Sequence, residues 1–392
     1  MMTIPATQSA ARSPRDLHPA RLLLILFLGQ IALYLMASLV FDYGTLRLRG
    51  FGTGDDFHFF YGAAGYWLSG ASPYLEDAYV TPPPAMLPAA LLHRLPMETA
   101  LLVFNLVTLP LMLVGLWKFG KAMELTRRNR ILYLAVAATF PPLWMTLNGG
   151  NVDGLMLILL LFACSARRKI TRVVLLACSI VVKVYSALMV VVLLRKREFA
   201  AVGLVAAACL LALLPFWRLW PEMIHALLFR TQRQNINFNI SPAELFFFLF
   251  RFLGPVAWKI LYAGFWFGTF AYTLVRRGAA AEAESLAVFA PWMVSAPLLV
   301  FSYAGIIALP ALALLLRTFQ DRPLRRPEWL MVTGILLLGF HPEFVANYWT
   351  LSFLTFAFLR GVVTATGCLG TSLLVIGATA AARADSRLRS GA

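Results

Sequence analysis

Apolar stretches of about twenty residues recur from residue 21 to near the C-terminus, and they constrain this chain more than any other feature. Hydrophobic residues make up 60% of the 392 positions, which excludes a soluble globular protein. Lipid cannot satisfy backbone polar groups, and the stretches lack the alternation of polar and apolar residues found in membrane barrels. We therefore predict an all-α, polytopic transmembrane protein with about 11 spans, within a range of about 10 to 13.

The distribution of charge sets the expected orientation of the chain. The formal net charge is +16, and most basic residues lie in short clusters between apolar stretches, where they mark cytoplasmic loops. This pattern predicts contact with membrane lipids and no binding of nucleic acid. We expect a disordered cytoplasmic N-terminus at 1–20, a single transmembrane domain at 21–382 and a short polar tail at 383–392. The first outer loop is expected at 42–97 and includes a proline-broken helix that lies at the interface.

The apolar stretch 173–194 departs from the regular alternation of sides, because basic clusters flank both of its ends. A single crossing would place one of these clusters outside. Lys183 stands near the middle of the stretch, where a lysine costs roughly 2.5 to 3.5 kcal/mol unless it faces protein, water or an anion. We infer a re-entrant pair of half-helices with Lys183 near the turn, which implies a cavity at that depth.

The stretch GDDFHFFYGAAGYWLSGASPY, residues 54–74, begins with an acidic pair just beyond the first apolar stretch. The predicted topology places this pair, and most of the other acidic residues, on the outer side. The outer loops are long and aromatic, whereas the cytoplasmic loops are short and basic. We therefore expect any active site to open at the outer face.

Four motifs resemble a known family. DDFHFFYGAAGYWLSGASPY followed by TPPPAMLPAALL, then NGGNVDGLMLILLL, VVKVYSALMVVVLLRKR and NINFNISPAELFFFLFR are similar, in this order, to segments of the family 87 membrane glycosyltransferases. The resemblance implies the GT-C fold and a sugar donor carried on polyprenyl phosphate. The chain departs from the family pattern at four positions: Asn151 replaces Gln, Asp153 replaces Asn, Ser186 replaces Pro, and Tyr303 stands near a frequent His.

A donor of this kind reduces the catalytic requirement to one general base. The leaving lipid phosphate is already a stable anion and needs no protonation, so one carboxylate at the membrane surface suffices. Asp56 matches the family's Asp-Phe pattern and is our first candidate, and Asp55 is the second. The alternative is that the pair only caps an interfacial helix starting near Phe57, since Asp is a favoured N-cap residue.

The lipid phosphate needs cationic ligands near the membrane. Lys183 is one candidate, with the alternative that it is a structural lysine paired with Asp153. Arg230 and Arg233 are further candidates, with the alternative that they are solvated or bound to lipid headgroups.

Polar and aromatic residues of the outer segments are candidates for binding the sugar or the acceptor. Asn151 and Asp153 suit hydrogen bonds to sugar hydroxyls, or a divalent cation (Mg²⁺ or Mn²⁺) shared with Asp56, although helix capping explains them equally well. No firm cofactor and no metal site follow from the sequence. The remaining candidates are Tyr61, Asn239, Tyr303 and His341. Tyr61 belongs to an aromatic set that also suits an interface belt.

These observations lead to three functional hypotheses. The first is a hexosyltransferase, mannose-type by preference, that moves one sugar from polyprenyl phosphate to a lipid or glycan acceptor at the outer face of the plasma membrane, with inversion. The second is a flippase or other transporter of lipid-linked sugars, with Lys183 and the acidic residues along its path. The third is a catalytically silent scaffold derived from such an enzyme. No Gly-rich phosphate loop, Rossmann-like domain or cytoplasmic Asp-x-Asp suggests a nucleotide-sugar donor.

Overall fold

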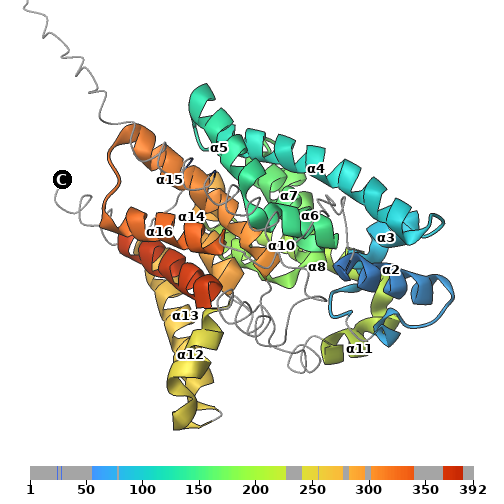
Figure 1. Cartoon of the computed structure of the whole chain (residues 1–392). Coiled ribbons are helices and arrows are strands. Elements are labelled where there is room, and N and C mark those ends of the chain that lie inside the picture. Colours follow the sequence, from blue (N-terminus) through green and yellow to red (C-terminus); the bar gives the residue numbers. More distant parts are fainter. Residues whose placement is uncertain are drawn as a thin grey trace, which may run out of the picture.

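The computed structural model of the chain is helical throughout the part that it describes (Figure 1). The described residues are 24, 28, 55–76, 79–226, 241–254, 256–276, 282–295, 302–339 and 365–382. No strand occurs within these ranges, which confirms the all-α prediction. The expected segments 1–20 and 383–392 lie outside them.

Short helices and turns make up the segment predicted as the first outer loop. They are α2 (Asp55–Leu68), η2 (Pro73–Leu75), η3 (Pro83–Met86) and α3 (Leu87–Leu92). Two buried tyrosines hold the segment together: Tyr74 donates a hydrogen bond to the carbonyl of Thr81 at 3.0 Å, and Tyr79 donates one to that of Pro82 at 2.8 Å. Burial raises the pKa of both phenols, so each stays a neutral donor.

A proline pair breaks the chain after the first long helix. The elements are α4 (Met97–Ala122), α5 (Arg127–Thr139), α6 (Pro141–Gly149) and α7 (Val152–Ser165). The sequence predicts one helix over 131–147, but α5 and α6 meet at an angle of 59°. A residue before proline avoids helical ψ, and Phe140 is accordingly extended, with φ −80° and ψ 111°.

The stretch around Lys183 folds as a helical hairpin, and Lys183 lies near its turn as predicted. It consists of α8 (Lys169–Val182), η4 (Val184–Ala187) and α9 (Leu188–Arg195). Lys183 lies between the helical parts with extended backbone, φ −146° and ψ 117°. Arg172 in the first turn of α8 pairs with Glu198, which follows α9, at 2.7 Å. The chain therefore returns to the end from which it entered, with Lys183 at the far end of the hairpin.

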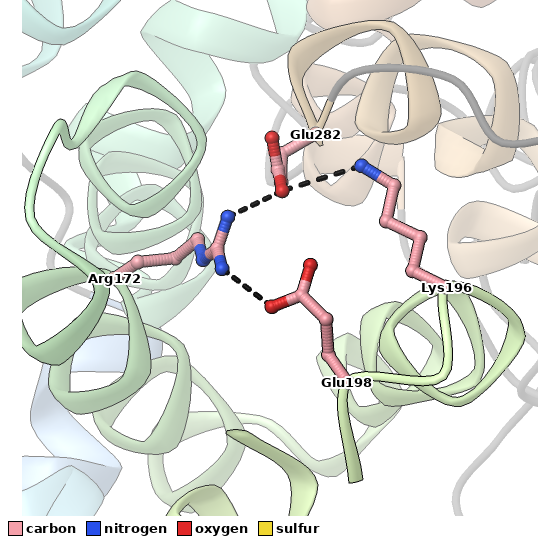
Figure 2. A network of polar contacts seen from close by, with 4 residues as sticks. All are labelled: Arg172, Lys196, Glu198 and Glu282. Carbon is pink, nitrogen blue, oxygen red and sulfur yellow. Dashed lines mark hydrogen bonds and ion pairs between the residues drawn. The ribbon is translucent and has the colours of Figure 1, made fainter. Parts of the chain in front are cut away.

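An ion-pair network ties this hairpin to a later helix (Figure 2). Arg172 binds Glu282 Oε1 through Nη1 and Glu198 Oε2 through Nη2. Lys196 Nζ also lies 3.2 Å from Glu282 Oε1. Burial acts to raise the pKa of Glu282, but its backbone hydrogen bond and the two cations lower it overall. We call this end of the bundle the ion-pair end.

A second set of ion pairs belongs to the same end. Arg317 lies 2.8 Å from Glu124 and 3.7 Å from Glu284, two residues along from Glu282. The loops joined in this way are those that the sequence assigns to the cytoplasmic side. Their meeting at one end agrees with the orientation expected from the positive-inside pattern.

The remaining helices complete the bundle, and one of them, α14, is buried along almost its whole length. They are α10 (Phe199–Leu213), η5 (Leu214–Leu219), α11 (Trp220–His225), α12 (Pro242–Phe250), η7 (Arg251–Leu253), α13 (Ala257–Arg276), α14 (Glu282–Ser295), η8 (Ser302–Ala308), α15 (Leu309–Asp321), α16 (Arg326–Leu338) and a last helix, Ala365–Ala382. Helix α14 contacts α7, α9, α13, α15 and η8. Figure 1 shows α12 and α13 projecting together from this bundle as a helical hairpin.

Three described helices are long and apolar enough to cross a membrane: Met97–Ala122, Phe199–His225 and Ala365–Ala382. The bent pair α5 and α6 makes a fourth if it counts as one span. Only residues 24 and 28 of the expected first span, 21–41, are described. The crossing expected at 344–359 lies outside the described residues. The count of about 11 spans therefore stays a prediction.

Glycines set the spacing between α16 and the last helix. A Cβ added to Gly334 would lie 2.6 Å from the carbonyl oxygen of Gly370, and one added to Gly377 would lie 2.7 Å from that of Pro327. Small residues allow such close backbone approach, which stabilises helix pairs in lipid by van der Waals contact.

We therefore expect Gly334→Leu to separate these helices and to lower the unfolding temperature of the detergent-purified protein, at a cost of about 1 to 3 kcal/mol or more from overpacking. Gly268→Leu is the matched control, because a Cβ at Gly268 meets nothing within 4 Å. Equal unfolding temperatures for the two variants would contradict the close packing.

The re-entrant hairpin predicts where its two flanks are accessible. In a protein whose native cysteines are replaced by alanine, Arg168→Cys and Arg197→Cys should both react with a membrane-impermeant maleimide from the cytoplasmic side, because both flanks lie at the ion-pair end. Glu98→Cys, at the opposite end of α4, should react from the outer side. Labelling of the two flanks from opposite sides would show a single crossing instead.

Candidate active site

Helix α2 places Asp56 against the bundle. Phe57 is buried and packs on Phe104 of α4, with ring centroids 5.5 Å apart. Ala63 and Ala64 are fully buried and let α2 lie close to its neighbours. Asp56 is half-buried and lies inside the first turn of the helix, not before it. This position does not match the capping alternative, which needs a helix starting after the acidic pair.

The tight turn between α6 and α7 lies beside Asp56. Gly150 ends α6 in the left-handed region, with φ 63°, which glycine adopts without steric cost. A Cβ there would lie 2.6 Å from Leu101 Cδ1 and 2.7 Å from Phe57 Cβ. A Cβ at Gly149 would lie 3.2 Å from Asp56 Oδ2. The glycine pair therefore permits both the turn and the close approach of the carboxylate.

Asn151 joins this turn to Asp56. Its Nδ2 donates to Asp56 Oδ2 at 3.0 Å, and its Oδ1 accepts from the backbone N–H of Asp153 at 2.8 Å. The helix-capping interpretation of Asn151 is thus correct, and the same side chain also fixes one oxygen of Asp56. Asn105 of α4 supports the turn from below, because its Nδ2 donates to the carbonyl of Leu147 at 2.9 Å.

Asp153, in the first turn of α7, reaches the end of the re-entrant hairpin. Lys183 Nζ lies 3.6 Å from Asp153 Oδ1, and the Tyr185 hydroxyl donates a hydrogen bond to the same oxygen. The Asp153 side chain is 2% exposed and that of Lys183 is 21% exposed. The Lys183–Asp153 pair, one of the two alternatives for Lys183, is therefore present. In this pair the Lys183 side chain is more accessible than that of Asp153.

A continuous series of contacts runs from Asp56 to Lys183, through Asn151 and Asp153. Helices α7 and α8 have 14 residues each, so each rises by about 21 Å from the ion-pair end. A hydrocarbon core is about 30 Å thick, so, with the ion-pair end at the cytoplasmic surface, we expect this polar cluster at membrane depth toward the outer side. Ionisable side chains at such depth are costly and mark functional sites.

Other predicted site residues lie elsewhere or outside the described part. The Tyr61 hydroxyl lies 2.7 Å from the carbonyl oxygen of Leu95 and 3.1 Å from that of His93, and its ring packs on the His93 ring. Tyr61 thereby fixes the start of α4. Tyr303 belongs to η8, which packs against α6. Arg230, Arg233, Asn239 and His341, together with the side chains of Asp55 and Tyr303, lie outside the described residues.

Cation binding at this cluster meets an electrostatic obstacle. Asp153 Oδ1 already has an ammonium group and a hydroxyl as partners, so a divalent ion there would face the positive charge of Lys183. Among the residues that the structure describes, no group of three His, Cys, Asp or Glu side chains is arranged to hold a metal.

Three features of the site were missed from the sequence. Tyr185 follows Lys183 by two positions. A tyrosine within an apolar stretch usually needs a hydrogen-bond partner for its hydroxyl, and this requirement was the available signal. The pair Gly149–Gly150 before a capping Asn was the signal for a tight turn. Asn105 is a buried amide in a long apolar helix, a position where polar residues usually bind another segment.

The fold and this cluster define a helical protein with membrane-length apolar helices and a buried ionisable site. A profile described as glycosyltransferase family 87 matches residues 79–302, more than half of the chain. The chain therefore belongs to glycosyltransferase family 87 and is a glycosyltransferase. The match includes Asn151, Asp153 and Lys183, and it begins after Asp56. No curated protein sequence matches the chain.

The α6–α7 turn yields a prediction on stability. Gly150→Ala should destabilise the protein by about 1 to 3 kcal/mol, because the added methyl meets Leu101 and Phe57 and the left-handed backbone disfavours alanine. Thermal unfolding in detergent measures the loss. Gly203→Ala is the control, since a Cβ at Gly203 meets nothing within 4 Å. Unchanged stability of the Gly150 variant would contradict the described turn.

Proposed function

We propose that this glycosyltransferase moves a single sugar from a polyprenyl-phosphate donor to an acceptor hydroxyl at the outer face of the plasma membrane, with Asp56 as general base. The observation that carries the proposal is the series of contacts that joins Asp56 to Lys183 at membrane depth. A prenyl phosphate keeps its chain in lipid and its phosphate and sugar at the membrane surface, next to the end of the bundle where we expect this series of contacts. Family membership supports the transfer reaction itself.

Lys183 is proposed to bind the donor phosphate. Its ammonium group has three donors, its side chain is partly accessible, and its backbone is fixed at the end of the hairpin. An ammonium at this position strengthens binding because the surroundings are of low dielectric. Arg230 and Arg233 are proposed as further phosphate ligands from the adjoining outer segment.

Asp56 is proposed to accept the proton of the attacking hydroxyl. Asn151 holds Oδ2 of this carboxylate, which fixes its orientation before the acceptor arrives. The acceptor oxygen then bonds to the anomeric carbon from the face opposite the phosphate. The bond from this carbon to the phosphate oxygen breaks, the electron pair leaves with the lipid phosphate, and the anomeric configuration inverts.

The remaining candidates are proposed for substrate recognition. Asn239, Tyr303 and His341 come from segments expected on the outer side and suit hydrogen bonds to sugar or acceptor. Asp55 is kept as the alternative base. Mannose-type hexoses are the proposed sugar class, and the proposed acceptor is a lipid or glycan. The Tyr61 hydroxyl already contacts backbone carbonyls, so we propose a positioning role for this residue.

Replacement of Asp56 by Asn tests the base directly. Asp56→Asn should lower transfer of labelled mannose from polyprenyl-phosphate mannose by about 10²-fold or more, because the amide cannot accept the proton. Glu98→Gln is the matched control, because Glu98 is an exposed carboxylate in the first turn of α4. This variant should keep wild-type activity. Unchanged elution and unfolding temperature would show that both variants are folded. Full turnover by Asp56→Asn would remove this residue from the mechanism.

A carrier of lipid-linked sugars is the second candidate function. The Lys183–Asp153 pair favours it, because ionisable pairs at membrane depth also occur along transport paths. Proteoliposomes separate the two functions. A transferase forms a new glycosidic bond, whereas a carrier moves the labelled donor across the bilayer unchanged. A parallel assay with EDTA tests whether the reaction needs a divalent cation such as Mg²⁺ or Mn²⁺.

A further inference from the structure

One oxygen of Asp153 has two partners from the re-entrant hairpin. The Tyr185 hydroxyl donates to Oδ1, and Lys183 Nζ lies 3.6 Å from the same atom. Direct charge-assisted hydrogen bonds between an ammonium and a carboxylate are shorter, at about 2.7 to 2.9 Å. The hydroxyl is therefore the closer partner, and the ammonium is the looser one.

Binding of an anion by Lys183 would change the surroundings of Asp153. The Asp153 side chain is 2% exposed, so water does not replace a lost partner. A buried carboxylate that loses its counter-ion is strongly destabilised unless hydrogen bonds satisfy its oxygens. An enzyme in which Lys183 turns to a phosphate thus needs a second group to hold Asp153.

We propose that Tyr185 is this group: a positioning residue that keeps Asp153 hydrogen-bonded while Lys183 turns toward the donor phosphate. The inference rests on the proposed function, because it takes the phosphate of the donor as the anion. The position of Asp153 in the first turn of α7 adds the positive end of the helix dipole to the same carboxylate.

The backbone around Lys183 supports a movement confined to its side chain. The Lys183 N–H donates to the carbonyl of Ser179 at 2.9 Å, and the Ser186 hydroxyl donates to the carbonyl of Lys183 at 2.9 Å. Ser186 also lies 3.2 Å from the Ser179 hydroxyl. These bonds fix the turn of the hairpin, so the aliphatic stem of Lys183 supplies the freedom to move between Asp153 and a phosphate.

The experiment uses the full-length protein in detergent and farnesyl phosphate, which carries no sugar, as the probe. Tyr185→Phe removes the hydroxyl and keeps the ring, whose centroid lies 6.0 Å from Lys183 Nζ. We expect this variant to bind farnesyl phosphate about 10-fold more weakly, because Lys183 can no longer leave Asp153 without an unpaired carboxylate. Tyr133→Phe is the matched control, since the buried Tyr133 hydroxyl has no partner among the described residues, and it should bind as the wild type does.

A double-mutant cycle separates this role from a merely structural one. Asp153→Asn removes the charge that Tyr185 holds, so Tyr185→Phe should have less than about a twofold effect on binding in that background. Equal loss in both backgrounds, or wild-type affinity of Tyr185→Phe, would overturn the proposal.

A failure of the proposed function would give different binding results from a failure of this inference. If wild-type protein does not bind farnesyl phosphate, or binds it equally well after Lys183→Met, the phosphate site itself is wrong and this inference falls with it. If Lys183→Met abolishes binding while Tyr185→Phe does not weaken it, the phosphate site stands and only the role of Tyr185 is wrong. In transfer assays, Tyr185→Phe should raise KM for the donor and leave kcat nearly unchanged.

Discussion

The structure of the site depends on short helices that end inside the bundle. Helix α7 begins, and α8 ends, among buried residues, where backbone groups and charged side chains need partners from the protein. The protein meets this constraint with side chains: Asn151 caps α7, Asn105 binds the end of α6, and Ser186 binds the carbonyl of Lys183. The same requirement brings polar residues together at one depth. A cluster able to bind a lipid phosphate is therefore a consequence of how the short helices are terminated.

Two ends of the bundle have different tasks. At the ion-pair end, Arg172, Glu198, Glu282 and Lys196 join segments distant in sequence and hold the base of the hairpin. At the other end of the hairpin, Lys183 has an exposed fraction that the buried Asp153 lacks. The fixed base and the accessible end follow from the same topology, since both ends of a re-entrant segment emerge on one side. This arrangement gives a cation at membrane depth a rigid support.

Much of the fold follows from hydropathy and charge alone. The helical class and the hairpin around Lys183 were predictable, because apolar length and flanking basic residues directly reflect the cost of crossing lipid. The pairing of Lys183 with Asp153 was one of two stated alternatives, since a buried cation needs an anion.

Other features depend on tertiary contacts that a single sequence does not reveal. The contact between Asp56 and Asn151 joins positions 95 residues apart. The bend at Pro141 was not predicted, because the sequence is apolar both before and after it. Hydropathy therefore treats α5 and α6 as one span. The hydroxyl of Tyr61 was expected near the sugar and instead binds backbone, because its orientation depends on where α3 ends. The number of spans and the roles of Arg230, Arg233, Asn239 and His341 stay predictions.

The ion-pair network also orders the biogenesis of the protein. Glu282 leaves the ribosome only after α10 to α13, so the hairpin is made long before its partner in α14 exists. If the hairpin is re-entrant, neither of its flanks crosses the membrane. Arg172 and Lys196 then stay on the cytoplasmic side until α14 is made. Docking of α14 then fixes the hairpin from below. We therefore expect the hairpin to gain its final support only after α14 has been made, because a nascent chain cut short before α14 would hold Asp56, Asp153 and Lys183 without this ion-pair anchor.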